Sequence, residues 1–251
     1  MNYKSDVEAV DAFVAKYKEL KDEIAKVIVG QDKVIKNTLI SIFSQGHVLL
    51  VGVPGLAKTL LINTIGQALG LSFNRIQFTP DLMPSDIIGT EILDENRKFK
   101  FIKGPVFSNI ILADEINRTP PKTQSALLES MQEKAVTVAG MSYKLDQPFF
   151  VLATQNPIEQ EGTYPLPEAQ LDRFMFNLIL DYPSFSEEMD VVKRTTVGQL
   201  VEVNEVLDAK SILFFQQLLR KIPVADNVLE YAVKLVSKTR PNTPEAHEWA
   251  N

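Results

Sequence analysis

The sequence contains no cysteine and only two histidines, His47 and His247, which stand far apart in the chain. Disulfide bonds and thiolate metal sites are therefore excluded, and a zinc site built on histidines is not expected. His47 opens an apolar run, where we expect it to pack or to cap a strand. The lack of cysteine is compatible with a reducing compartment, and we expect a cytoplasmic location.

Long apolar runs are missing as well. No run approaches the roughly 20 apolar residues that span a bilayer, and the N-terminus lacks the apolar core of a signal peptide. The net charge of −6 argues against a chain that coats DNA, although it leaves room for a local basic patch. With 251 residues, of which 45% are hydrophobic, we expect a globular chain with a core domain and a smaller second domain.

The most informative segment is a glycine-bearing turn between an apolar run at 47–51 and a helix-patterned run at 58–69. Such a turn aims backbone N–H groups at phosphate oxygens, and the following helix adds the partial positive charge of its N-terminus. A lysine there supplies a mobile charge for the outer phosphates, and the hydroxyl after it is a ligand for Mg²⁺. The segment reads Gly52, Val53, Pro54, Gly55, Leu56, Ala57, Lys58, Thr59 and Leu60.

Ala57 departs from the general pattern, which has a second glycine before the lysine. Alanine adds only one methyl group, so the phosphate site stays intact if Ala57 keeps right-handed backbone angles. The alternative is an ordinary strand-to-helix turn in which the Lys-Thr pair occurs by chance.

Two acidic residues, Asp114 and Glu115, directly follow the apolar run at 109–113. In an α/β sheet such a run is a buried strand, and ligands bind at its carboxyl end. Asp114 would then hold Mg²⁺ through water, and Glu115 would orient and deprotonate the attacking water. The alternative is an acidic pair that caps the next segment, and the Lys-Thr pair earlier in the chain favours the catalytic interpretation.

Asn156 follows a third apolar run and would share the carboxyl edge of the sheet with Asp114 and Glu115. Its amide could fix the attacking water or contact the γ-phosphate, whereas an isolated asparagine at a strand end is usually a turn former. Arg173 precedes the last apolar run. Its guanidinium is a candidate for a neighbouring subunit's γ-phosphate, and the alternative is an ion pair with Asp172 or another surface acid.

Strand and helix candidates alternate along the chain, which predicts the α/β class with a parallel sheet wrapped on both faces. The strands are expected at 47–51, 73–78, 109–113, 149–154 and 174–180, and the helices at 6–28, 32–44, 58–69, 120–132, 186–198, 208–221 and 226–239. We divide the chain into a nucleotide-binding core with N-terminal helices at 1–183 and a helical lid domain at 184–251. The lid is expected to be incomplete, because the chain stops without a clear domain end.

Two segments interrupt the alternation and are expected to form inserted β-hairpins, at 90–101 and at 135–145. The second would turn at Ala139 and Gly140. Basic residues gather at 97–103, in and just beyond the first hairpin. We interpret them as a solvated face, and the alternative is a contact surface for an acidic partner or a nucleic acid.

Taken in chain order, these motifs resemble an AAA+ ATPase of the MoxR family. The matching segments are Gly-x-x-Gly-x-Ala-Lys-Thr at 52–59, Leu-Ala-Asp-Glu-Ile-Asn-Arg at 112–118, Ala-Thr-Gln-Asn-Pro at 153–157 and Leu-Asp-Arg-Phe at 171–174. The resemblance is close over about 27–183 and loose over the helical remainder. It implies a five-stranded P-loop NTPase core, two inserted hairpins, a helical lid and a ring, usually hexameric, with the nucleotide between subunits.

The resemblance also assigns roles, motif by motif. Lys58 and Thr59 match the phosphate and Mg²⁺ positions, Asp114 and Glu115 the positions for Mg²⁺ and hydrolysis, Asn156 the sensor-1 position and Arg173 the arginine finger. Val29, Gly30 and Gln31 match the segment whose backbone lies against adenine. The family's sensor-2 motif, in which Pro-Arg-Ala follows a Gly, Ser or Pro, does not occur before Asn251, and Arg240 is a poor substitute because a proline follows it.

We therefore expect Mg²⁺-dependent ATP binding and hydrolysis by a ring-forming ATPase that remodels or matures a protein client. The resemblance implies a client that often carries a von Willebrand A domain, and we expect neither a nucleic-acid nor a membrane partner. One alternative is a nucleic-acid motor, because related AAA+ helicases carry similar hairpins and the segment at 97–103 is basic. Another is a nucleotide-gated scaffold with little turnover, against which Glu115 argues, since a pure binder needs no catalytic base.

Overall fold

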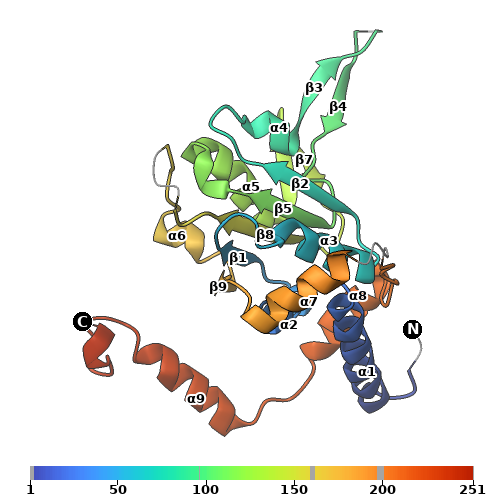
Figure 1. Ribbon diagram of the computed structural model, residues 1–251. Coiled ribbons are helices and arrows are strands. Elements are labelled where there is room, and N and C mark those ends of the chain that lie inside the picture. The colour runs from blue at the N-terminus through green and yellow to red at the C-terminus, as the bar shows by residue number, and fades with distance from the viewer. Residues whose placement is uncertain (1–2, 96, 159–161, 197–200, 251) are drawn as a thin grey trace. The chain divides into compact units, whose positions relative to one another are not determined.

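Five parallel strands form the central sheet of the computed structural model, which describes residues 3–95, 97–158, 162–196 and 201–250 (Figure 1). Their order across the sheet is β2-β5-β8-β1-β9. The five predicted strands are confirmed, with ends that shift by one or two residues. The strands are β1 (Val48–Val51), β2 (Phe73–Gln77), β5 (Ile110–Asp114), β8 (Phe150–Gln155) and β9 (Phe176–Ile179).

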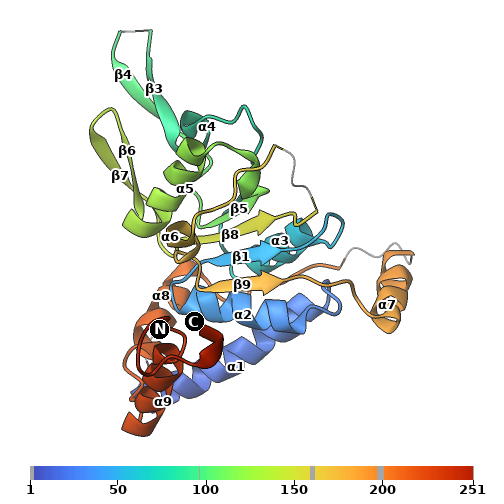
Figure 2. The ribbon, with the colours of Figure 1, turned by 90° about the vertical axis from the view of Figure 1, so that its left-hand side faces the viewer.

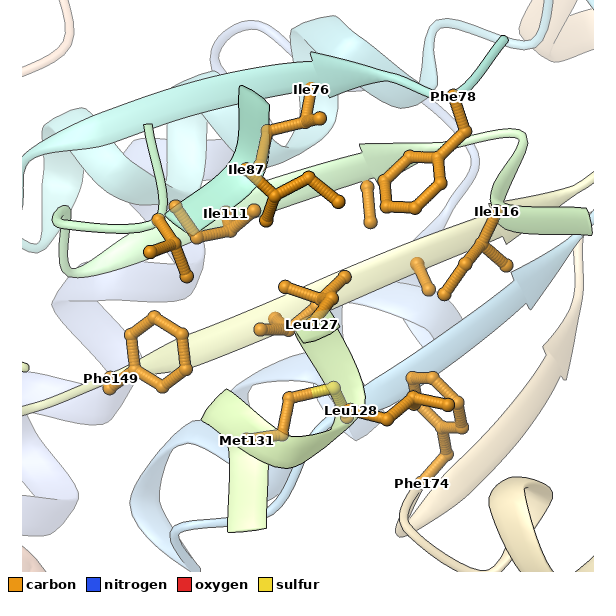
Figure 3. Packing of buried hydrophobic residues seen from close by; sticks show 14 of the residues in the cluster. Ile76, Phe78, Ile87, Ile111, Ile116, Leu127, Leu128, Met131, Phe149 and Phe174 are labelled. Carbon is orange, nitrogen blue, oxygen red and sulfur yellow. The ribbon is translucent and has the colours of Figure 1, made fainter. Parts of the chain in front are cut away.

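Apolar side chains on both faces of these strands explain why the sheet is buried. Successive residues of a strand point to opposite faces, so Ile111 and Ala113 share one face while Ile110 and Leu112 share the other. The first pair belongs to a core cluster that also contains Leu127, Leu128 and Met131 of the helix α5 (Pro121–Glu133) (Figure 3). On the other face, Gly66 of the helix α3 (Lys58–Ala68) packs close to the side chain of Ile110. Helices therefore cover both faces, as the sequence predicts.

The long helices also lie close to where periodicity predicts them. Ser5 caps α1 by accepting a hydrogen bond from the Glu8 N–H, and prolines open α5, as expected at a helix start. Residues 197 and 198, the end of one expected helix, lie outside the described residues. The helices are α1 (Asp6–Ala25), α2 (Asp32–Phe43), α3 (Lys58–Ala68), α5 (Pro121–Glu133), α7 (Phe185–Thr196), α8 (Ala209–Leu219) and α9 (Asp226–Ser237).

Four short helical elements are not anticipated by the sequence analysis. A run of three to five residues is too short to show a helical period. They are α4 (Pro84–Ile88), the 3₁₀ turn η1 (Ile116–Arg118), α6 (Glu168–Leu171) and the 3₁₀ turn η2 (Glu248–Ala250).

Both inserted hairpins are confirmed, and they lie side by side (Figure 2). β3 (Gly89–Leu93) pairs with β4 (Phe99–Lys103), and β6 (Ala135–Val138) pairs with β7 (Met141–Lys144). The second hairpin turns at Ala139 and Gly140, both with positive φ, as a two-residue hairpin turn requires. Phe101 of β4 stacks on Tyr143 of β7 with ring centroids 4.0 Å apart, so an aromatic contact joins the two hairpins.

The chain divides into two compact units, Met1–Gln216 and Gln217–Asn251. The expected boundary after residue 183 lies inside the first unit, so the division into a core and a lid domain stays a prediction. α7 belongs to the first unit, and so does most of α8. Among the described residues, no helix has both the length and the apolar character to cross a membrane.

Candidate active site

The predicted phosphate-binding turn connects the end of β1 to the first residue of α3, Lys58. Gly55 has φ of +87°, which only glycine adopts without strain. Ala57 has φ of 53° and ψ of 27°, so the condition that it keeps right-handed angles is not met. The chain needs a left-handed residue to enter α3 here, and this explains why a glycine is usual at the position. An alanine in that conformation costs about 1–2 kcal/mol and still admits the turn.

Lys58 lies between the turn and the two acidic residues. Its Nζ donates a hydrogen bond to the Gly52 carbonyl oxygen at 2.6 Å. Partial burial lowers the pKa of Lys58, while the negative charges of Asp114 and Glu115 oppose that shift. Thr59 follows in the exposed first turn of α3. The turn, the lysine and the helix N-terminus thus meet where the sequence predicts a phosphate site.

Asp114 ends β5 and has hydrogen-bond donors on both carboxylate oxygens. The Thr154 hydroxyl donates to Oδ1 at 2.6 Å. Arg75, on the neighbouring strand β2, donates to Oδ2 from Nη2 at 2.6 Å and from Nε at 3.1 Å. The Thr154 Oγ1 also accepts the Glu115 backbone N–H at 2.8 Å, so one hydroxyl fixes both acidic residues to β8.

Glu115 adopts a left-handed conformation, with φ of 56° and ψ of 49°, directly before η1. This conformation turns the chain sharply at the end of β5 and costs of the order of 1 kcal/mol or more. The Glu115 Oε2 accepts hydrogen bonds from Gln77 Nε2 at 2.9 Å and from Arg118 Nη1 at 3.1 Å. A strained residue whose carboxylate is held by two donors is typical of a functional position.

Asn156 directly follows β8, which lies between β5 and β1. It is buried, and its Oδ1 accepts the Ile158 N–H at 3.1 Å. The asparagine therefore does form a turn, as the alternative interpretation requires, and it also lies at the sheet edge that carries Asp114. Because the turn uses the oxygen of the amide, the nitrogen is the end that can meet a phosphate or a water molecule.

Arg173 lies at the opposite end of the sheet from the phosphate turn. It precedes β9, which runs parallel to β1 with Phe176 opposite Val48. A strand rises about 3.3 Å per residue, so roughly a strand length separates Arg173 from the turn that follows Val51. Arg173 is exposed and forms no ion pair with Asp172 or with another acid among the described residues.

A small cavity of about 190 Å³ adjoins the phosphate turn. Its lining is mainly apolar, as the flat face of a purine base prefers. Val29 and Gln31 of the predicted adenine segment line this cavity, whereas Gly30 lines an adjoining groove beside β9. The lining residues are Val27, Ile28, Val29, Gln31, Gly55, Leu56, Ala57, Leu60, Leu61, Pro183, Val191, Arg194 and Thr195.

Three groups of site residues escape the sequence analysis. Arg75 and Gln77 alternate on β2 and so share a face, but nothing in the linear spacing places β2 beside β5. Thr154 is a polar residue at the end of an apolar run, and this is a signal that could have found it. The residues that α7 contributes to the cavity, such as Arg194, carry no recognisable motif.

The donor set of this site fits a magnesium nucleotide. A left-handed glycine turn, a lysine and a helix N-terminus suit phosphate groups, and the hydroxyl of Thr59 with the carboxylate of Asp114 suits a hard cation such as Mg²⁺. The apolar cavity next to the turn suits the base.

Comparison with known proteins agrees with this arrangement. Residues 47–176 match the model of the ATPase family associated with various cellular activities (AAA). The chain is 48% identical over 221 residues to the "Uncharacterized protein YeaC" of Bacillus subtilis, an alignment that covers 87% of this chain and 69% of that protein. It is also 48% identical over 219 residues to "Chaperone MoxR1" of Mycobacterium tuberculosis, covering 87% of this chain and 58% of the relative.

A solved structure shows the same architecture over nearly the whole chain. The crystal structure of a "putative ATPase" from Cytophaga hutchinsonii superposes with a TM-score of 0.87 at 50% sequence identity, and the match covers 94% of this chain and 72% of that one.

Proposed function

The chain belongs to the MoxR family of AAA+ ATPases, and we propose that it binds and hydrolyses ATP with Mg²⁺ as part of a ring that remodels a client protein. The observation that carries this proposal is the meeting of Lys58, Asp114 and Glu115 at the carboxyl ends of β1 and β5, beside an apolar cavity. The residues proposed for phosphate, metal and base thus lie close together.

For binding, different residues of the site contact the phosphates, the metal ion and the base. The backbone of 52–57 and the Lys58 side chain hold the phosphates, while Thr59 and Asp114 hold Mg²⁺. Val29 and Gln31 form one wall of the base cavity. Bound Mg²⁺ would supply charge neutralisation at the phosphates.

For hydrolysis, Glu115 orients a water molecule and accepts its proton. Gln77 and Arg118 hold the Glu115 carboxylate through the hydrogen bonds to Oε2. The nitrogen of the Asn156 amide is available to fix the same water or the γ-phosphate. Arg173 lies too far along the sheet to serve its own phosphate turn, which supports a role as an arginine finger toward a neighbouring subunit.

The ring and its client belong to the proposal as well. A hexamer would place each Arg173 at a neighbour's nucleotide, and the mycobacterial relative is named as a chaperone. A client with a von Willebrand A domain and a cytoplasmic location complete the proposal.

The basic hairpin does not favour the alternative of a nucleic-acid motor. Lys98 and Lys100 are exposed, but the outer Leu93–Phe99 pair is exposed too, at 61% and 75%. A surface with exposed apolar side chains next to lysines is better suited to bind a protein than to bind the phosphate backbone of a nucleic acid.

Two variants test the proposed function. Lys58→Ala should abolish tight ATP binding in calorimetry, since it removes the lysine that the turn presents to the phosphates. Glu115→Gln should keep ATP binding and stop turnover, because the amide keeps the shape but loses the base. An affinity that survives Lys58→Ala would refute the phosphate site, and a kcat within about twofold of wild type in Glu115→Gln would refute the base. Proteins that copurify with ATP-loaded Glu115→Gln would identify the client.

A further inference from the structure

The C-terminus of α1 is capped by an arginine that lies far away in the sequence. α1 has no basic residue in its own last turn. Arg194 of α7 instead donates hydrogen bonds from Nη1 to the carbonyl oxygens of Ala25 at 3.0 Å and Lys26 at 3.2 Å. Carbonyl groups at a helix C-terminus lack partners within the helix and carry partial negative charge, so a guanidinium is well suited to them.

The capped end of α1 leads straight into the base cavity. Val27, Ile28 and Val29 follow the two capped carbonyls in the chain and line the cavity. Arg194 and Val191 of α7 line the same cavity. The Arg194 side chain therefore links α7, which lines the cavity, to the residues directly before the segment 27–31 that would face the base.

The other end of α7 approaches the same segment closely. Gly30 has φ of +73°, and a Cβ there would lie 2.5 Å from the carboxyl carbon of Glu187. Glu187 is itself held, because its Oε2 accepts hydrogen bonds from the Ser184 N–H and hydroxyl, each at 2.7 Å. α7 therefore lies along residues 25–31, with Glu187 against Gly30 at one end and Arg194 hydrogen-bonded to Ala25 and Lys26 at the other.

We propose that Arg194 is a positioning residue for the nucleotide base, which holds the wall at 27–31 against α7. This inference rests on the proposed nucleotide site. The Arg194 guanidinium is already committed to the α1 carbonyls and to Asp190, whose Oδ2 lies 2.7 Å from Nη2. It therefore acts through the wall, whereas the phosphate turn is anchored separately by β1 and α3.

The experiment compares wild type with Arg194→Ala by two measurements. Calorimetry with ADP should show affinity lowered by about tenfold, as expected for the loss of charge-assisted hydrogen bonds. Hydrogen exchange at saturating ADP should show that ADP protects 27–31 less than in wild type, while its protection of 52–59 is retained. If Arg194 only stabilised the fold in general, its loss would reduce protection by ADP in both segments alike.

Two further variants on α7 serve as controls. Lys193→Ala removes a neighbouring exposed positive charge that has no hydrogen bond or ion pair to α1 among the described residues, and it should leave ADP affinity within about twofold of wild type. Arg194→Lys keeps the charge but offers one compact ammonium for two carbonyls, so it should lose part of the affinity in the same direction. It also carries the test if Arg194→Ala does not fold.

The outcomes separate this inference from the proposed function. Wild type that fails to bind ADP overturns both. Wild type that binds ADP, with unchanged affinity in Arg194→Ala, overturns the inference alone. An equal loss of protection at 27–31 and 52–59 overturns it as well, because the effect would then be general loosening of the fold.

Discussion

Arg75 directs two guanidinium nitrogens at one carboxylate oxygen of Asp114, at 2.6 and 3.1 Å. Asp114 is the residue proposed to hold Mg²⁺, so a positive side chain already neutralises the predicted metal ligand. Arg75 stands on β2, an edge strand of the sheet, and its side chain is 47% exposed. Solvent reaches the guanidinium and screens part of the attraction, while the Asp114 side chain is only 14% exposed, so we expect a pair of modest strength.

The first prediction concerns this competition. Arg75→Ala should lower the Mg²⁺ concentration at half-maximal ATPase activity by about threefold, since a surface pair contributes of the order of 0.5–1 kcal/mol. A Mg²⁺ titration at fixed ATP measures it. Arg75→Lys keeps the positive charge but loses the forked guanidinium, so its Mg²⁺ requirement should lie between those of wild type and Arg75→Ala. An unchanged or raised Mg²⁺ requirement in Arg75→Ala would contradict the competition and make Arg75 a support for Asp114.

The second prediction concerns the left-handed Ala57. Ala57→Gly should raise the free energy of unfolding by roughly 0.5–1 kcal/mol, because glycine adopts positive φ without the methyl clash. Denaturant titration measures the change. Ala15→Gly, at an exposed position inside α1, is the matched control and should lower stability by about 1 kcal/mol. Destabilisation by both substitutions to the same extent would mean that Ala57 carries no strain.

The third prediction is a pH dependence that arises from His47. His47 is buried, and its Nδ1 accepts the Val151 N–H at 3.0 Å. Burial lowers the pKa of His47 from 6.5 to about 4. Between these two values the unfolded chain binds a proton that the folded chain excludes, so stability is full above pH 6.5 and falls as the pH drops toward 4.

The size of this effect can be isolated with one substitution. Between pH 7 and 5, wild type should lose about 2 kcal/mol more unfolding free energy than His47→Gln, which cannot titrate but can still accept from Val151. Carboxylates contribute equally to both proteins and cancel in the comparison. Parallel pH profiles for the two proteins would show that His47 is not the group responsible.

The fold and the chemical core of the site could be predicted because local signals carry them. Apolar runs set the strands, and glycine, lysine and paired acids next to those runs mark the carboxyl edge. The contacts that hold these residues depend on strand order and helix packing. Arg75 meets Asp114 only because β2 lies beside β5, and Arg194 caps α1 only because α7 lies along 25–31.

Local backbone handedness is a second limit on sequence reasoning. The motif names the residues of the phosphate turn but not their φ angles, so it does not reveal that Ala57 is left-handed. Glu115 is a similar case, because it has φ of 56° although residues other than glycine rarely adopt positive φ. In both places the requirements of the site outweigh the preference of the residue.

The last prediction concerns assembly. Arg173 lies at the amino end of β9 and forms no ion pair among the described residues, so its guanidinium is available to a neighbour but not to its own phosphate turn. Arg173→Ala should bind ATP with normal affinity and hydrolyse it roughly 10³-fold or more slowly, since an arginine finger contributes about 10³–10⁵ in rate. Wild-type activity per subunit should rise with protein concentration until subunits assemble.

Subunit mixing distinguishes a finger acting between subunits from a structural arginine. Lys58→Ala subunits keep their arginine but lack a working phosphate site, and Arg173→Ala subunits have the reverse defect. A mixture should recover part of the activity, because an intact site can then face an intact finger. Activity per subunit that stays flat on dilution, together with no recovery in the mixture, would leave Arg173 without a catalytic role. Arg118 would then be a poor replacement, because its Nη1 already pairs with Glu115 of the same chain at 3.1 Å.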